Sequence, residues 1–547
     1  MESGSAEKAV SAHEEITGAD YGSHADDAPS KPEGTIDFSE RVEMKQGLQS
    51  RHIQMIALAG AIGTGLFLNS GRGVASAGPL GALLGYAFVG TLVAGMVFSL
   101  AEMAALAPLS GGIVRFAELF VDPSLSFANG WNVVYKGFIF VPTEVVAAAV
   151  LMEFWIQVNS AIWITVFGVV MVAINFLFIG VYGEIEFWFA TLKIFLIIMV
   201  NIMAIVIVSG GAPNGQAIGF RYWQDPGPMV QYLGISGSLG RFLGFWSVFT
   251  NAVYAYSGID NVALAAAETA NARATIPKAA KKTFWRILLF YIVTMFFVGM
   301  LVPSNNKHLV SGSGSAASPF VIAADLAGIR VIPHIINGIV VTSAWSAGNA
   351  GYMVYSRYLF GLAKSGHAPK VFLRLNRWGI PYVAAIFIGS SILLGYMTTS
   401  NSAAEVFSWL QGLLSIAILV NWTVVIVVYL RFFYGCKKQG ISRDELPYKS
   451  PFQPYFSWIC LVVFVLILIT SGWSAFLKHR WSTKAFVSAY ANIPMVLILY
   501  FAHKQIKKTK IIPLDKIPIR QLLDIANNEL VLPEKPKKGI RKLNFLW

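Results

Sequence analysis

The chain has 547 residues, of which 55% are apolar and only 13% are charged, and its formal net charge at pH 7 is +13. This composition is typical of a polytopic membrane protein and excludes an ordinary soluble domain. The only two cysteines, Cys436 and Cys460, exclude the disulfide framework of a small secreted protein.

Residues 1–47 are polar, acidic and rich in Ser, Ala and Gly, which predicts a disordered tail without a cleavable signal peptide. From residue 48 to about 508, apolar segments follow one another. Each is close to the roughly 20 residues that a helix needs to cross a bilayer. None shows the alternation of a strand. We predict twelve spans, at 53–75, 79–107, 126–157, 160–180, 184–209, 241–269, 284–303, 330–362, 381–398, 402–431, 453–477 and 484–503.

The positions of Lys and Arg predict the orientation, because cytosolic loops carry an excess of these residues. Most of the 42 lie in the two tails and in the segments 270–286, 357–377 and 431–449, all on one side of the predicted spans. Both termini, including the tail at 509–547, are therefore expected in the cytosol, where basic residues can contact anionic lipid. No basic patch with stacking aromatics lies in a soluble domain, so nucleic acid is not an expected partner.

Two of the spans are interrupted by glycine. Span one contains LAGAIGTGLFLNSG at 58–71, although each glycine in a helix costs roughly 1 kcal/mol relative to alanine. Span six, five spans later, contains Ser257-Gly258, with Asp260 just beyond. Interrupted spans at corresponding positions of two halves are typical of an inverted-repeat transporter. The repeats would cover about 53–209 and 241–431, with two extra helices within 453–503.

A break inside the membrane leaves backbone N–H and C=O groups without partners, so it must line a cavity or be buried in protein. Free N–H groups attract an anion and free C=O groups attract a cation, which suits a zwitterionic amino acid. Close packing between helices is the alternative explanation for the glycines, and for Gly60 and Gly71 it is the favoured one. The candidate substrate site comprises Ile62, Gly63, Thr64, Gly65, Tyr256, Ser257, Gly258 and Asp260.

Ionisable side chains inside spans are further candidates, because they are costly in a membrane and often functional. Glu144 in span three is a candidate proton carrier, since a carboxyl group buried without a partner favours its protonated form. A structural hydrogen bond is the alternative. Lys136, about 12 Å away along the same helix, could neutralise an acidic substrate, pair with a carboxylate, or extend to the membrane surface. Glu102 is expected to be structural. In span eight, Ser343, Ser346 and Asn349 could line a polar path or bond across helices.

Four stretches follow a family pattern: GAIGTGLFLNSG (60–71), FANGWNVVYKGFIFVPTEVVAAAV (127–150), AAAETANARATIPKAAKKTFWR (265–286) and SAGNAGYMVYSRYLFGLAKSGHAPKVF (346–372). They resemble, in that order, the first span, the third span, the segment after the sixth span, and the eighth span of the fungal amino acid permeases. These permeases form part of the amino acid–polyamine–organocation superfamily. The resemblance runs from about 47 to 515. The stretches 301–309 and 429–458 are most similar to the dicarboxylic (glutamate/aspartate) subgroup.

This resemblance implies an all-α, LeuT-like fold of twelve helices and proton-coupled amino acid uptake at the plasma membrane, with acidic amino acids favoured. It also implies a coupling role for Glu144 and for Lys193 in span five, whose ammonium would replace a bound cation near the span-one break. Extension of Lys193 to the membrane surface is the alternative. The expected partners are an amino acid, protons, membrane lipid, and trafficking or ubiquitin machinery at the tails. No cofactor or metal is expected.

Other functions stay open at this stage. A broad-range or neutral amino acid permease is the alternative within the family. A sensor that binds amino acids without transporting them would keep the site but would not need a proton carrier. A membrane enzyme would need a metal site or a nucleophile with its base. The eight histidines fall in tails, loops and span ends without metal-ligand spacing, so an enzyme is not expected.

Overall fold

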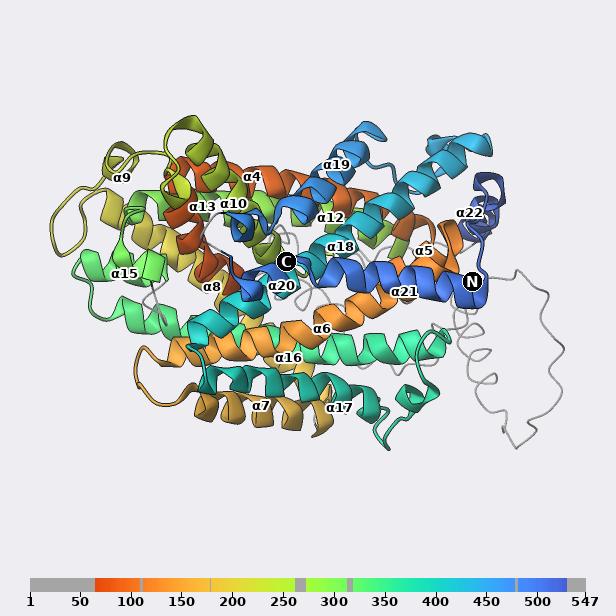
Figure 1. Ribbon diagram of the computed structural model, residues 1–547, viewed down its shortest axis with the longest axis horizontal. Helices are drawn as coiled ribbons and strands as arrows, with labels where there is room; N and C mark the ends of the chain where they lie inside the picture. The colour runs from red at the N-terminus through yellow and green to blue at the C-terminus, as the bar shows by residue number, and fades with distance from the viewer. Residues whose placement is uncertain are drawn as a thin grey trace, which may run out of the picture. The chain divides into compact units, whose positions relative to one another are not determined.

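The computed structural model describes residues 64–108, 112–177, 179–260, 272–311, 318–477 and 481–528. The predicted N-terminal tail, together with Ile62 and Gly63 of the candidate site, lies outside these residues. All regular elements in the described part of the chain are helical, as Figure 1 shows.

The first half begins with a helix that turns back on itself. In α4, Gly78 has φ +79° and ψ 172°, and Pro79 follows it, so the spans predicted at 53–75 and 79–107 meet at this bend. At the start of α6, the Asp122 carboxylate caps the helix by accepting from the Ser124 N–H. The elements of this half are α3 (Thr64–Phe67), α4 (Asn69–Leu106), α5 (Ile113–Phe120), α6 (Pro123–Met152), α7 (Ser160–Leu177), α8 (Ile179–Val208), α9 (Arg221–Gln224) and η2 (Tyr232–Gly234).

The second half contains several interrupted helices. Span six is represented by α10 (Gly237–Ala255), and span seven changes from α-helix to π-helix and back. Its elements are α12 (Ala272–Arg286), η3 (Ile287–Ile292), α13 (Val293–Leu301), α14 (Lys307–Ser311), α15 (Pro319–Leu326), α16 (Ile332–Lys364), η5 (Lys370–Leu373), α17 (Tyr382–Ser390), η6 (Ser391–Thr399) and α18 (Ala403–Lys438). The last elements are η7 (Arg443–Glu445), α19 (Tyr455–Thr470), η8 (Trp473–Phe476), α20 (Thr483–Tyr490), α21 (Asn492–Lys507), η9 (Leu514–Lys516) and α22 (Ile519–Asn528).

Among the described residues, six helices are long and apolar enough to cross a membrane, or seven if the bent pair α20–α21 counts as one span. The prediction of twelve spans is therefore not confirmed as a count. The difference has a physical cause. The bend at Gly78 merges two predicted spans into α4, and span seven is divided into short pieces. The helices α10 and α16 are long enough, at 19 and 33 residues, but are not apolar enough to be counted.

The helix α8 shows how the spans divide lipid-facing from buried surface. Trp188, Phe195 and Ile202 recur every seven residues and are all exposed. Glu186 and Lys193 occupy another face of the same helix and are buried. A stripe of large apolar side chains that faces outward is stable only against lipid. The polar face of α8 therefore points into the protein.

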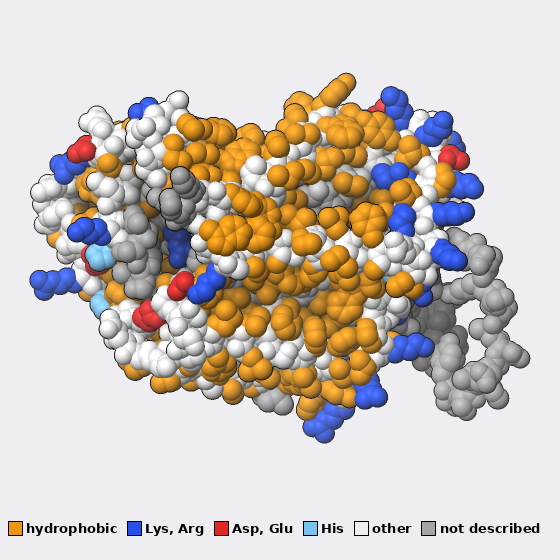
Figure 2. All heavy atoms as spheres, in the orientation of Figure 1, with side chains coloured by type: hydrophobic (Ala, Val, Ile, Leu, Met, Phe, Trp, Pro, Cys, Tyr) orange, Lys and Arg blue, Asp and Glu red, His pale blue; other side chains and the backbone are white. Residues whose placement is uncertain are grey.

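Long helices pack in the interior of the described part. The helix α4 packs along α10, while α6 packs against both α16 and α18. Figure 2 shows a broad band of hydrophobic side chains across the face in view. Lys and Arg side chains gather at the end where α5 and α22 lie. This distribution is the one that the positive-inside rule describes for a membrane protein.

Candidate functional site

The sixth span breaks where its sequence predicts. The helix α10 ends at Ala255, and residues 256–260 form turns in which Gly258 has φ +80°. A side chain would be strained at this φ, so the turn requires glycine. The Tyr256 hydroxyl donates to the Tyr86 carbonyl (2.9 Å), which directs this side chain toward α4. At Tyr256, therefore, the backbone is the part that can contribute to a substrate site.

Gly65 lies directly against the end of α10. A Cβ added to Gly65 would stand 2.5 Å from Ala255 Cα and 3.1 Å from its backbone nitrogen. Only glycine permits two helix backbones to approach this closely. The packing alternative therefore accounts for Gly65. The same contact joins span one to the end of α10 in span six; the residues before Thr64, where span one is predicted to break, lie outside the described part of the chain.

A buried triangle of hydroxyl and carboxyl groups lies beside this contact. Thr64 Oγ1 of α3 donates to Glu144 of α6 and is 3.1 Å from each carboxyl oxygen. The Tyr254 hydroxyl of α10 donates to Glu144 Oε1 (3.0 Å). Thr64 Oγ1 lies 2.8 Å from the Tyr254 hydroxyl oxygen. All three residues are at most 2% exposed. Glu144 thus bridges the first and sixth spans from the third.

A second carboxylate lies near this triangle. Glu186 of α8 accepts hydrogen bonds from Ser346 Oγ of α16, at 2.8 and 2.9 Å. Lys193, seven residues after Glu186, is within Coulombic range of both Glu186 and Glu144. The structure therefore brings predicted Glu144 and Lys193 together and adds Glu186, which sequence reasoning misses. Its spacing from Lys193, two helical turns on one face, is the signal that could have revealed it.

The predicted polar residues of span eight bond across helices. Besides Ser346, Asn349 Oδ1 accepts from Asn175 Nδ2 of α7 (2.5 Å). Ser343 Oγ is buried without a hydrogen-bond partner among the described residues. Of the two roles considered for this span, structural hydrogen bonding is observed for Ser346 and Asn349.

Lys136 and Asp260 form a buried ion pair. Lys136 Nζ donates to Asp260 Oδ2 (3.1 Å), and both side chains are at most 6% exposed. Asn421 Nδ2 of α18 donates to the same oxygen (3.1 Å), while Asp260 Oδ1 has no partner among the described residues. Pairing with a carboxylate is thus the observed state of Lys136. The pair lies about two helical turns from Glu144 along α6, so it is a separate cluster.

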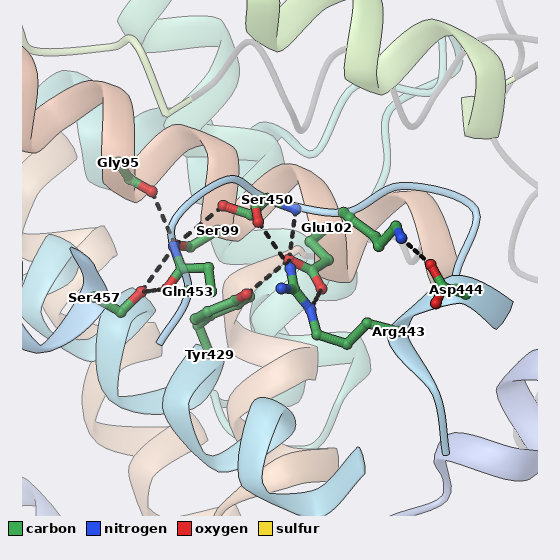
Figure 3. Close-up of polar contacts among 10 residues, drawn as sticks. Gly95, Ser99, Glu102, Tyr429, Arg443, Asp444, Ser450, Gln453 and Ser457 are labelled. Atoms are coloured by element: carbon green, nitrogen blue, oxygen red, sulfur yellow. Dashed lines mark hydrogen bonds and ion pairs between the residues drawn. The ribbon is translucent and has the colours of Figure 1, made fainter. Parts of the chain in front are cut away.

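Glu102 is held by groups from the other end of the chain. Figure 3 shows Arg443 and Tyr429 converging on it near the end of α4. Arg443 donates to both carboxyl oxygens (3.0 and 2.8 Å), and the Tyr429 hydroxyl and Ser450 N–H donate to Oε2. Partial burial opposes the Arg443 charge, but the bonds and charge of Glu102 outweigh it and raise the pKa of Arg443. The contacts agree with the structural role expected of Glu102.

Asp122 forms a similar anchor at the start of α6. Its carboxylate accepts from Lys504 Nζ (2.6 Å), Thr509 Oγ1 (2.8 Å) and the Ser124 N–H (2.8 Å). Burial tends to raise the pKa of Asp122, but these hydrogen bonds outweigh it and lower that pKa below its usual value. The anchor ties the last described segment to the first turn of α6.

Comparisons with known proteins identify the family of this chain. The amino acid permease family model matches residues 52–515. The chain belongs to the amino acid permease family. Over 530 residues it is 37% identical to a dicarboxylic amino acid permease of Saccharomyces cerevisiae, covering 95% of this chain and 86% of the relative. It is 39% identical to a proline-specific permease of the same yeast, covering 86% of this chain and 77% of the relative.

The permease also resembles solved transporters in fold. A manganese transporter from Eremococcus coleocola is 15% identical with a TM-score of 0.53, covering 87% of this chain and 95% of that one. This confirms the predicted all-α, LeuT-like fold class. Among the described residues no group of three His, Cys, Asp or Glu side chains could hold a metal ion. The permease is a membrane transporter for amino acids rather than an enzyme, as predicted.

Proposed function

We propose that this permease takes up amino acids, acidic ones by preference, across the plasma membrane together with protons. The observation that carries the proposal is the position of Glu144. Its carboxyl group contacts Thr64 and Tyr254, which lie on the two interrupted spans. A change in the protonation of Glu144 therefore acts directly on both halves of the candidate substrate site.

The number of hydrogens in the triangle favours a proton-carrying role. Thr64, Tyr254 and Glu144 make three short contacts with one another. When Glu144 is ionised, only the two hydroxyl groups supply hydrogens, so one contact lacks one. Protonation of Glu144 supplies the third hydrogen and lets every contact become a hydrogen bond. The closed triangle thus stabilises the protonated state, and separation of the two spans would release the proton.

Charge balance supports the same role. Glu144 and Glu186 are two buried carboxyl groups within Coulombic range of one ammonium, that of Lys193. With both carboxyl groups ionised the cluster has a net charge of −1, and an uncompensated buried charge is costly. One added proton makes the cluster neutral. We assign that proton to Glu144 and the ion pair with Lys193 to Glu186, which Ser346 already holds.

The remaining assignments follow the predicted topology. We propose that both termini are cytosolic, that 48–508 forms the transporter domain with repeats at about 53–209 and 241–431, and that 453–503 holds the extra helices. The basic end seen in Figure 2 then faces the cytosol and anionic lipid. The tails at 1–47 and 509–547 would be accessible to trafficking or ubiquitin machinery.

Two features support a preference for acidic substrates. One relative is a dicarboxylic amino acid permease that matches over 95% of this chain. In addition, the spans near the site contain buried or half-buried cations, which a second substrate carboxylate requires. A neutral or broad-range permease is the second candidate, because the proline-specific relative is 39% identical, slightly more than the dicarboxylic one, over a shorter length.

The test measures labelled glutamate uptake together with cytosolic pH in cells that lack their own uptake systems. We expect glutamate entry to acidify the cytosol and aspartate to compete better than glutamine. Glu144→Gln should abolish concentrative uptake. The control is Glu153→Gln, which should retain concentrative uptake. Glu153 follows the last residue of α6, and its half-buried carboxyl group accepts a hydrogen bond from Ser160.

Two results would contradict the proposal separately. Continued acidification in step with substrate entry in the Glu144→Gln protein would exclude Glu144 as the proton carrier. Equal competition by aspartate and glutamine would refute the acidic preference while leaving the permease function intact. Binding of glutamate to the purified protein without any uptake would favour a sensor.

A further inference from the structure

Arg72 lies on the first turns of α4, eight residues beyond Thr64, and contacts the aromatic side of the site. Its guanidinium carbon stands 5.8 Å from the centre of the Phe407 ring at the start of α18. That ring packs edge-on against Tyr254, with centroids 6.2 Å apart. Tyr254 in turn donates to Glu144. Arg72 is also within Coulombic range of Tyr254 itself, so it lies beside the aromatic residues that adjoin Glu144.

Arg72 differs from the other two cations near the site, because no carboxylate of the described residues pairs with it. Lys136 pairs with Asp260, and Lys193 is within Coulombic range of Glu186 and Glu144. The half-buried Arg72 guanidinium has neither an ion pair nor a hydrogen bond with the described residues. The contact with the aromatic face attracts the guanidinium, but it offsets only part of the cost of burying the charge. The positive charge of Arg72 is left available to an anion.

Unpartnered polar atoms occur beside the same contact. Both side-chain polar atoms of Asn69, one turn before Arg72, are buried without a partner among the described residues. Gln411 Oε1, one turn after Phe407 on α18, is also buried and unpartnered, while its amide nitrogen donates to Asn251 (3.1 Å). Buried polar groups without partners are rare, and they indicate a place that a polar ligand or water completes. Donors and acceptors therefore flank the free cation on both helices.

We infer that Arg72 binds the side-chain carboxylate of an acidic amino acid and so determines the preference for acidic over neutral substrates. The inference rests on the proposed uptake of acidic amino acids and assigns their recognition to one residue. Arg72 offers a planar fork of donors that matches a carboxylate in a bidentate geometry. Lys136, in contrast, must first lose Asp260 before it can bind a substrate. Neutral substrates have no side-chain carboxylate to place at Arg72, so its charge does not favour them over acidic ones.

The experiment compares initial uptake of labelled glutamate and glutamine, which have the same shape, in Arg72→Met, Arg72→Lys and Lys136→Met proteins. Surface abundance is measured in parallel. Arg72→Met should lower the glutamate-to-glutamine ratio at least tenfold, and Arg72→Lys should retain part of the preference. Arg241→Met is the matched control, since Arg241 is an exposed cation at the start of α10, and its ratio should equal that of the parent.

A second measurement does not depend on transport or on abundance at the surface. Glutamate should raise the thermal unfolding temperature of the purified parent, because a ligand that binds only the folded state stabilises it. Arg72→Gln should lose this shift for glutamate and keep it for glutamine. Equal losses for both amino acids, or a ratio that falls only in Lys136→Met, would overturn the assignment to Arg72. A parent that takes up no glutamate would instead refute the proposed acidic uptake.

Discussion

Replacement of Gly65 by alanine tests whether close contact between the interrupted spans is needed for transport. The added Cβ would stand 2.5 Å from Ala255 Cα, a backbone atom that cannot turn aside. Overpacking of this kind costs typically 1–3 kcal/mol. Alanine also gains up to about 1 kcal/mol over glycine in a helix. The clash should therefore win and displace α3 from α10, which separates Thr64 from Tyr254.

We expect Gly65→Ala to reduce glutamate uptake at least tenfold and to lower the thermal unfolding temperature of the purified protein. Uptake is measured in cells and corrected for surface abundance. Gly73→Ala is the matched control on α4, since its added Cβ would meet the Tyr86 ring at 3.5 Å, an ordinary van der Waals distance. There only the helix gain remains, so Gly73→Ala should be as stable as the parent or more so, with parental uptake.

A Gly65→Ala protein with parental uptake and parental unfolding temperature would refute this reasoning. Loss of uptake in both variants would show that neither α3 nor α4 tolerates an added methyl group. In that case the effect would not belong to the contact with Ala255.

Three further predictions concern the charged clusters. Glu186→Gln leaves Lys193 to be balanced by Glu144 alone, so the pH dependence of uptake should flatten; an unchanged dependence would contradict the charge-balance argument. Asp260→Asn leaves the buried Lys136 charge without its carboxylate and should lower the free energy of unfolding by about 3–5 kcal/mol. The double variant with Lys136→Met should recover much of that free energy. Because folding lowers the pKa of Asp122, its stabilisation is present above the pKa of the unfolded chain and is lost as pH falls through the lower, folded value. The difference in unfolding temperature between the parent and Asp122→Asn should therefore be constant near neutral pH and shrink below about pH 4.

The break in span six could be predicted because its cause is local. Gly258 adopts φ +80°, a conformation that side chains disfavour, and glycine in an apolar segment is a visible sign of it. The bend between spans one and two is equally local, since Gly78 and Pro79 are adjacent in the sequence. Such features need no knowledge of neighbouring helices. The prediction of the break in span six, which depends only on backbone conformation, therefore agrees with the structure.

The partners of the charged residues could not be predicted in the same way. Lys136 and Asp260 are 124 positions apart, and nothing in either segment specifies the other. Glu186 is a different case, because its spacing from Lys193 is visible in the sequence, yet its importance follows only from the hydrogen bonds of Ser346. For Ile62 and Gly63 the prediction stands as made, because these residues lie outside the described part of the chain.

The two roles considered for the span-one glycines, substrate binding and helix packing, need not exclude each other. Gly65 is required for contact with Ala255, and that contact places Thr64 beside Tyr254 and Glu144. A larger residue at position 65 would leave the backbone groups available to a substrate, but it would separate Thr64 from Tyr254 and Glu144. Close packing at Gly65 is thus needed for Glu144 to contact both Thr64 of span one and Tyr254 of span six. Because Gly65 allows this close contact, a separation of the two helices would break the hydrogen bonds of Glu144 and so change its protonation.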